Sequence, residues 1–231
     1  MLFGGLQKNS LIDYPGKISC VIFLSGCNFD CPYCHNPDLV NGCMECPTLL
    51  EEDGFYDFLE SRRNFLDGVV ISGGEPTIQK DLGPLCEKIK NMGYSIKLDT
   101  NGSRPRAIKQ LIDYGLVDYI AMDIKTDPLC YDPIIKRDYN PEDLLSSIQV
   151  IMESAPAYEF RTTCVKGLVD KTIIEDIAKL IQGARLYALQ LFHDTTVLHP
   201  EFFHEADYYE EDDLMHLKAV AEPWVRECIV R

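Results

Sequence analysis

The sequence predicts an α/β fold, an open partial (β/α)6 barrel that forms one domain over residues 1–231. Apolar runs rich in β-branched residues recur along the chain, and segments with clear helix-start signals lie between them. Strands that alternate with helices in this way imply a parallel sheet with right-handed crossovers. Six strands in 231 residues fit an open barrel better than a full eight-stranded one.

Most of the predicted strands are near-continuous apolar runs, as expected for parallel strands that are buried on both faces. In chain order they are Ile18–Leu24, Gly68–Ser72, Ser95–Thr100, Tyr119–Asp123, Tyr158–Val165 and Leu186–Phe192.

The helix starts are marked by two capping boxes, Thr48–Glu51 and Thr172–Glu175, and by an N-cap before a proline at Asn140–Pro141. Further helices are predicted over Lys80–Asn91, Arg104–Tyr114 and Asp207–Val220, and the longest loop over Tyr131–Asn140.

The composition narrows the functional class. A net charge of −15 argues against nucleic acid as a partner, because phosphates require a basic surface. The sequence contains neither a signal-peptide pattern nor an apolar run that could span a membrane, so we expect a cytoplasmic protein without a membrane partner. In that compartment ten cysteines favour a metal or cluster over disulfides.

Three cysteines, Cys27, Cys31 and Cys34, follow the first predicted strand with the spacing C-x3-C-x2-C. Three thiolates in one short loop can bind three irons of a 4Fe–4S cluster. The fourth iron then has no protein ligand, and an open metal position is typical of a chemical site.

A structural zinc site is the alternative for these cysteines. Its fourth ligand would come from His35 or from the pair Cys43 and Cys46. Zinc sites more often show paired C-x2-C knuckles than this triplet, so the cluster is favoured. A zinc-stabilised interaction module would be colourless and would not bind a nucleoside ligand.

Polar motifs accompany every predicted strand, most of them at or just after its carboxyl end, where parallel α/β sheets bind their ligands. The cysteine loop follows the first strand and Gly73–Pro76 the second. Asp99–Gly102 ends the third strand, Met122–Lys125 ends the fourth, Arg161–Thr163 lies in the fifth and His193 ends the sixth. The sequence therefore predicts one site at one rim of the barrel.

Two of these motifs have a chemistry of their own. Gly73 and Gly74 let the backbone approach a ligand closely, although an ordinary turn would also explain them. Asp99, Thr100 and Asp123 offer oxygen ligands suited to a hard cation, and the alternative is that the two carboxylates cap the following turns.

The cysteine triplet, with the aromatic Tyr33 before its last member, resembles the radical S-adenosylmethionine (SAM) superfamily, and the later motifs resemble its glycyl-radical-enzyme activases. The resemblance implies an open partial (β/α)6 barrel of the radical SAM type, with Cys27, Cys31 and Cys34 on a 4Fe–4S cluster whose open iron binds SAM. It implies SAM-binding roles for Tyr33, Gly73, Gly74, Glu75, Asp99, Asp123, Lys125, Arg161, Thr163 and His193, with Lys125 also counted as catalytic. It further implies a monovalent cation held by Asp99, Thr100, Asp123 and the carbonyl of Ala121.

The segment Leu11–Lys17 resembles the activating proteins of anaerobic ribonucleoside-triphosphate reductase. The implied activity is reductive cleavage of SAM, followed by abstraction of a hydrogen from a glycine of the partner enzyme. A flavodoxin or ferredoxin-type protein would supply the electron. The alternatives are a pyruvate formate-lyase type of activase and a radical SAM enzyme for a small molecule. Cys43 and Cys46 are too few for a ferredoxin-like insert, and a non-catalytic role is favoured.

Overall fold

The computed structural model describes residues 3–40, 51–131, 135, 139–193, 195–203 and 208–231. Within these residues the strands form a single sheet in the order β1 to β8. β1 (Phe3–Ser10) runs antiparallel to β2 (Ser19–Leu24), and each later strand runs parallel to its neighbours. The later strands are β3 (Gly68–Gly73), β4 (Ser95–Thr100), β5 (Tyr119–Asp123), β6 (Tyr158–Cys164), β7 (Tyr187–Leu191) and β8 (Cys228–Val230).

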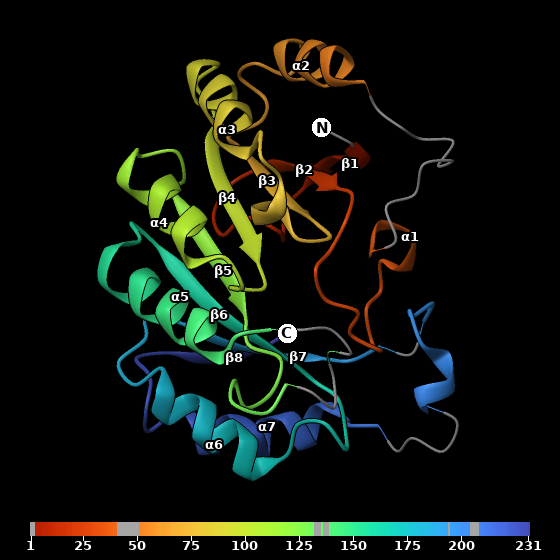
Figure 1. The fold of residues 1–231 in the computed structure, drawn as a ribbon, viewed down its shortest axis with the longest axis vertical. Coiled ribbons are helices and arrows are strands. Elements are labelled where there is room, and N and C mark those ends of the chain that lie inside the picture. Colours follow the sequence, from red (N-terminus) through yellow and green to blue (C-terminus); the bar gives the residue numbers. More distant parts are fainter. Residues whose placement is uncertain (1–2, 41–50, 132–134, 136–138, 194, 204–207) are drawn as a thin grey trace.

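Helices α2 to α7 lie along the outer side of the curved, unclosed sheet, whereas α1 lies apart from them (Figure 1). They are α1 (Pro37–Val40), α2 (Glu52–Ser61), α3 (Leu82–Asn91), α4 (Pro105–Asp113), α5 (Pro141–Ser154), α6 (Lys171–Leu180) and α7 (Glu211–Ala221). Two short 3-10 helices, η1 (Pro76–Ile78) and η2 (Pro200–Phe203), complete the described elements. No helix among the described residues is both long and apolar enough to cross a membrane.

The six predicted strands are confirmed as β2 to β7, which form the centre of the sheet. The two outermost strands were not predicted. β1 contains two glycines and three exposed residues, so it has no apolar run, and β8 has only three residues. Both are edge strands, whose single sheet neighbour and short or polar sequence leave a weak pattern.

One of the helix-start predictions is confirmed and one is wrong. The side chain of Asn140 accepts a hydrogen bond from the backbone of Glu142, as expected of an N-cap. In α6 the N-cap is Asp170, whose carboxylate accepts from the backbone of Ile173, so Thr172 lies inside the first turn. Glu51 precedes α2, while Thr48 lies outside the described residues.

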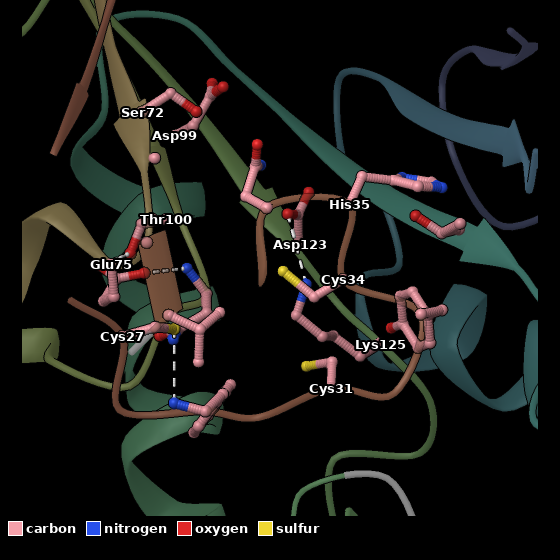
Figure 2. Close-up of a pocket in the computed structure, with 18 of the residues that line it drawn as sticks. Cys27, Cys31, Cys34, His35, Ser72, Glu75, Asp99, Thr100, Asp123 and Lys125 are labelled. Carbon is pink, nitrogen blue, oxygen red and sulfur yellow. Dashed lines mark hydrogen bonds and ion pairs between the residues drawn. The ribbon is translucent and has the colours of Figure 1, made fainter. Parts of the chain in front are cut away.

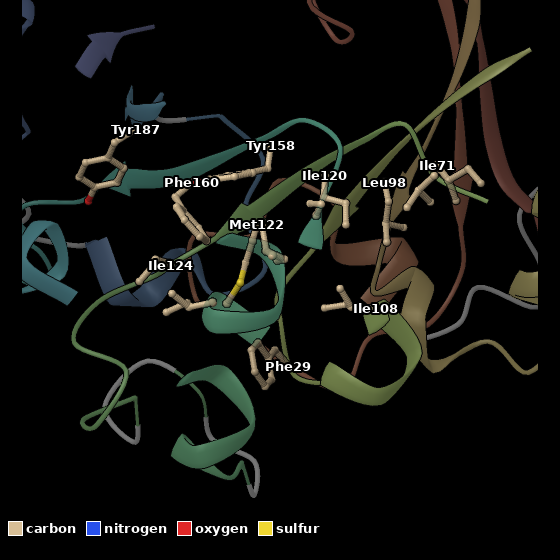
Figure 3. Close-up of a cluster of buried hydrophobic side chains, with 14 of the residues drawn as sticks. Phe29, Ile71, Leu98, Ile108, Ile120, Met122, Ile124, Tyr158, Phe160 and Tyr187 are labelled. Atoms are coloured by element: carbon tan, nitrogen blue, oxygen red, sulfur yellow. The ribbon is translucent and has the colours of Figure 1, made fainter. Parts of the chain in front are cut away.

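The parallel strands have two different faces. One face packs against the helices as a large apolar core, which includes Ile71, Leu98, Met122 and Phe160 (Figure 3). The opposite face of β4 to β6 carries charged and polar side chains instead, among them the buried Lys97. Because side chains alternate along a strand, a single strand supplies both the core and the polar interior.

Candidate active site

The polar motifs meet in one cavity of about 250 Å³ at the carboxyl ends of the parallel strands (Figure 2). Fourteen of the residues singled out in the sequence line it: Cys27, Cys31, Tyr33, Cys34, His35, Gly73, Gly74, Glu75, Asp99, Thr100, Asp123, Lys125, Arg161 and Thr163. Two others do not line it. Ala121 is fully buried within β5, and His193 is exposed beyond the end of β7.

The thiols of Cys27, Cys31 and Cys34, which lie on the loop after β2, all line this cavity (Figure 2). The backbone N–H of Phe29 donates to Cys27 Sγ at 3.4 Å, and the N–H of Cys34 donates to the carbonyl of Cys31 at 3.0 Å. Burial raises the pKa of Cys27 to about 11 and that of Cys31 to about 12. The positive charge of Lys125 opposes both rises, which favours the thiolate that a metal requires.

These residues fit a 4Fe–4S cluster better than a single ion. Among the described residues, no three His, Cys, Asp or Glu side chains are close enough to bind one metal ion together. In a cluster each thiolate binds a different iron, so the sulfurs remain apart. The buried hydroxyl of Tyr33, which lines the same cavity, has no hydrogen-bond partner and can bond to a ligand.

Glycines hold the cysteine loop against the end of β3. A Cβ at Gly74 would lie 2.0 Å from the carbonyl oxygen of Gly26, the residue before Cys27. The backbone N–H of Glu75 donates to that same carbonyl at 2.9 Å. The close approach expected of this motif is therefore to the cysteine loop itself.

Glu75 acts as a turn former within the protein. Its buried carboxylate accepts hydrogen bonds from the backbone and hydroxyl of Thr77, from the hydroxyl of Thr100 at 2.8 Å, and from the backbone of Asn101 at 2.6 Å. Burial raises the pKa of Glu75, and these four donors oppose that rise. The ends of β3 and β4 are thereby fastened together.

The two aspartates at the rim are paired with cations of the chain. Asp99 contacts Lys97 Nζ at 2.5 Å and Arg161 Nη1 at 3.5 Å. Asp123 contacts Arg161 Nε at 2.7 Å and Lys125 Nζ at 3.4 Å. Arg161 therefore bridges both carboxylates, in the space that the sequence assigns to a monovalent cation.

The charge pattern explains the ionisation of this group. Burial alone would raise the pKa of each aspartate, but the charges of Arg161 and of a lysine outweigh it. The pKa of Asp99 is lowered, and that of Asp123 falls to about 2. Of the three cations in this group, Lys125 and Arg161 line the cavity, and both can approach an anionic ligand there.

The other two predicted cation ligands, Thr100 and Ala121, have contacts within the protein. The hydroxyl of Thr100 is directed to Glu75, and Ala121 lies in the sheet opposite Asp99. His193 contributes through its backbone, because its carbonyl bonds to His35 Nε2 at 2.9 Å. Their predicted ligand roles remain predictions.

Several residues at the site were missed in the sequence. Phe29, Ser72, Asn101 and Gln190 line the cavity. Asn28 follows the first cysteine and bonds to the end of β4. The only signal for Asn28, Phe29 and Asn101 was their position inside a recognised motif. Cys43 and Cys46 lie outside the described residues, as does most of the predicted loop Tyr131–Asn140.

Comparison with known proteins identifies the family of the chain. A family model described as "Radical SAM superfamily" matches residues 21–180. A "putative glycyl-radical enzyme activating enzyme" of Methanocaldococcus jannaschii is 37% identical over 100% of this chain and 95% of its own length. A pyruvate formate-lyase-activating enzyme of Streptococcus mutans is 30% identical, covering 78% of this chain and 70% of its own.

The fold is also found in solved structures. SuiB of Streptococcus suis superposes with a TM-score of 0.68 at 13% identity, over 91% of this chain and 48% of SuiB. At that identity the likeness concerns the fold alone. The family match, the relatives and the cysteine-lined cavity agree. The chain is therefore an enzyme of the radical SAM superfamily, homologous to the glycyl-radical enzyme activating enzymes.

Proposed function

We propose that this enzyme cleaves SAM reductively at a 4Fe–4S cluster and generates a glycyl radical on anaerobic ribonucleoside-triphosphate reductase. The observation that carries the proposal is the cavity itself, where three cysteines of one loop share one lining with Lys125 and Arg161 at the strand ends. When bound, the cluster supplies the electron that breaks the C5′–S bond of SAM.

The residues of the chain bind and orient the ligand. Cys27, Cys31 and Cys34 would hold the cluster, and its iron without a protein ligand would be available to SAM. Lys125 and Arg161 line the cavity and attract that carboxylate. Exclusion of water from the cavity by bound SAM and the partner's glycine loop would protect a radical that would otherwise be quenched.

Tyr33 fits the remaining part of SAM. Its ring is buried beside the cysteines, and its unpaired hydroxyl offers a donor to a ligand atom. Asp99, Asp123 and Thr163 shape the wall across the cavity, where a monovalent cation would require Arg161 to move aside.

The identity of the partner rests on sequence. The segment Leu11–Lys17 resembles activating proteins of the anaerobic reductase, and similarity to a glycyl-radical enzyme activating enzyme extends over the whole chain. The similarity to a pyruvate formate-lyase-activating enzyme makes that lyase the second candidate. A flavodoxin or ferredoxin-type donor in an anaerobic cytoplasm would supply the electron.

Anaerobic electron paramagnetic resonance (EPR) tests the proposal. Reconstituted enzyme, SAM and reductant are mixed with the anaerobic reductase encoded in the same genome, and a glycyl-radical doublet is expected only when every component is present. If SAM is cleaved to 5′-deoxyadenosine without a doublet, the reductase is excluded as the partner, and the lyase is tested next. If reconstituted enzyme neither holds a cluster nor cleaves SAM, the whole proposal fails.

A further inference from the structure

The cysteine loop is tied to the end of β4 by a ring of polar side chains. Asn101 Nδ2 donates to Asn28 Oδ1 at 3.0 Å, and Asn28 Nδ2 donates to Ser103 Oγ at 2.8 Å. The backbone N–H of Ser103 closes the ring by donating to Asn101 Oδ1 at 3.0 Å. Asn101 and Ser103 are both buried, and Asn28 is half-buried.

The chemistry of the ring fixes its direction. A backbone N–H can only donate, so the atom of Asn101 that faces Ser103 must be the amide oxygen. The amide nitrogen of Asn101 then faces Asn28, which must present its own oxygen. The nitrogen of Asn28 is left to donate to Ser103, whose hydroxyl oxygen accepts. No aliphatic side chain at position 28 can satisfy both partners.

The ring acts on the cluster ligand beside it. Asn28 lies between Cys27 and Phe29, and the N–H of Phe29 donates to Cys27 Sγ. The ring of Phe29 is buried and packs edge-on against Tyr131 at 6.2 Å. The peptide that carries this N–H is therefore held by an apolar anchor after it and by the amide of Asn28 before it. Hydrogen bonds to ligating sulfur tune the potential of iron–sulfur clusters.

The same ring reaches the ligand cavity. The backbone N–H of Asn101 donates to Glu75, and Cys27, Glu75 and Asn101 all line the cavity. A ligand that contacts Asn101 in the cavity therefore contacts a segment that is hydrogen-bonded to Asn28 of the cysteine loop.

We propose that Asn28 is a positioning residue for the reductive cleavage of SAM: through Asn101 and Ser103 it fixes the N–H of Phe29 on Cys27 Sγ and thereby sets the reduction potential of the cluster. The inference rests on the proposed cluster but not on the identity of the partner. Asn28 touches neither the cluster nor SAM through its side chain in this role.

The test compares Asn28→Leu, which has similar size but no hydrogen bonds, with the native enzyme and with Asn9→Leu on the exposed edge strand. Iron and sulfide content, midpoint potential, the EPR spectrum of the reduced cluster and partner-free 5′-deoxyadenosine formation are measured anaerobically. With iron content retained, Asn28→Leu is expected to lower the midpoint potential and alter the EPR spectrum. Because the same reductant then reduces a smaller fraction of the clusters, cleavage is expected to slow about tenfold or more. Asn9→Leu is expected to match the native enzyme.

A second variant separates this role from mere folding. Ser103→Ala removes only the acceptor of Asn28 Nδ2, so it is expected to shift the potential in the same direction. Combining it with Asn28→Leu is expected to add little, because both changes break the same ring. An unchanged potential and spectrum in cluster-loaded Asn28→Leu would overturn the inference. If that variant holds no cluster, an unchanged potential in Ser103→Ala overturns it instead. A native enzyme that lacks a cluster would defeat the proposed function, whereas a missing glycyl radical alone would leave this inference intact.

Discussion

Gly74 lies just after β3, where the backbone packs against the cysteine loop. We expect Gly74→Ala to lose most of its cluster iron and about 1–3 kcal/mol of stability, because the new methyl group would meet the carbonyl of Gly26 at 2.0 Å. A shift of Gly26 away from this methyl group would also shift the next residue, the cluster ligand Cys27. Iron analysis after anaerobic reconstitution and denaturant unfolding measure the two effects.

Gly83 provides the matched control for that change. It lies in α3 with open space where a Cβ would be, so Gly83→Ala should keep its iron and gain up to about 1 kcal/mol of helix stability. Equal iron in both variants would show that the close approach at Gly74 is not needed to shape the loop.

At the scale of single residues, spacing in the sequence predicted the chemical groups but not their partners. The cysteine triplet and the glycine pair are local patterns, and both line the cavity as expected. The bonds of Glu75 to Thr100 and Asn101 join segments about 25 residues apart, which no local pattern records. Arg161 was predicted as a site residue from its place in a strand. Its contacts with Asp99 and Asp123 depend on the pairing of β4, β5 and β6, which the sequence does not reveal.

At the scale of elements, β8, which was not predicted from the sequence, brings a charge partner to a buried carboxylate. Glu159 of β6 is a fully buried carboxylate, and Arg231, which follows β8, bonds to it with Nη1 at 3.2 Å and Nη2 at 2.8 Å. The backbone of Arg231 also pairs with Leu189 and Leu191 of β7. Three residues were too few to predict a strand, but this ion pair anchors it.

We expect Arg231→Gln to destabilise the protein by about 3 kcal/mol, because it leaves the carboxylate of Glu159 buried without its charge partner. Anaerobic urea unfolding measures the loss, with Arg226→Gln, an exposed change before β8, as the control expected to stay within about 0.5 kcal/mol. Adding Glu159→Gln to the first variant should restore part of the stability, since it removes the buried charge. Equal midpoints for the two single variants would contradict this role of Arg231.

At the scale of the whole molecule, one face of the sheet packs in the apolar core and the opposite face carries side chains of the cavity. The face toward the helices is apolar and could be predicted from hydrophobic runs, which is why the central six strands were found. The other face holds Lys97, Asp99, Asp123 and Arg161, and its buried charges compensate one another across strands. Lys97 was not predicted there, because a lysine inside an apolar run is ordinarily exposed.

The last prediction concerns this compensated charge group as a unit. Arg161→Met removes the cation that bridges Asp99 and Asp123, and with it a charge proposed to attract the SAM carboxylate. A hydrogen bond to a charged group contributes about 1.5–3 kcal/mol, so SAM affinity should fall roughly tenfold to a hundredfold while iron content is retained. Arg106→Met, at the exposed start of α4, is the control expected to bind SAM normally.

The potassium dependence of SAM binding distinguishes a counter-ion from a simple binding residue. In the native protein both carboxylates are already neutralised by the chain, and an added cation has to compete with Arg161. In Arg161→Met the two carboxylates lose their shared partner, so potassium should strengthen SAM binding more than it does in the native enzyme. Equilibrium SAM binding at several potassium concentrations measures the coupling between the two ligands. Potassium and SAM must change each other's affinity by the same factor. An identical potassium response in the two proteins would mean that the bridge does not occupy the cation position, because removing Arg161 would then have exposed no new charge.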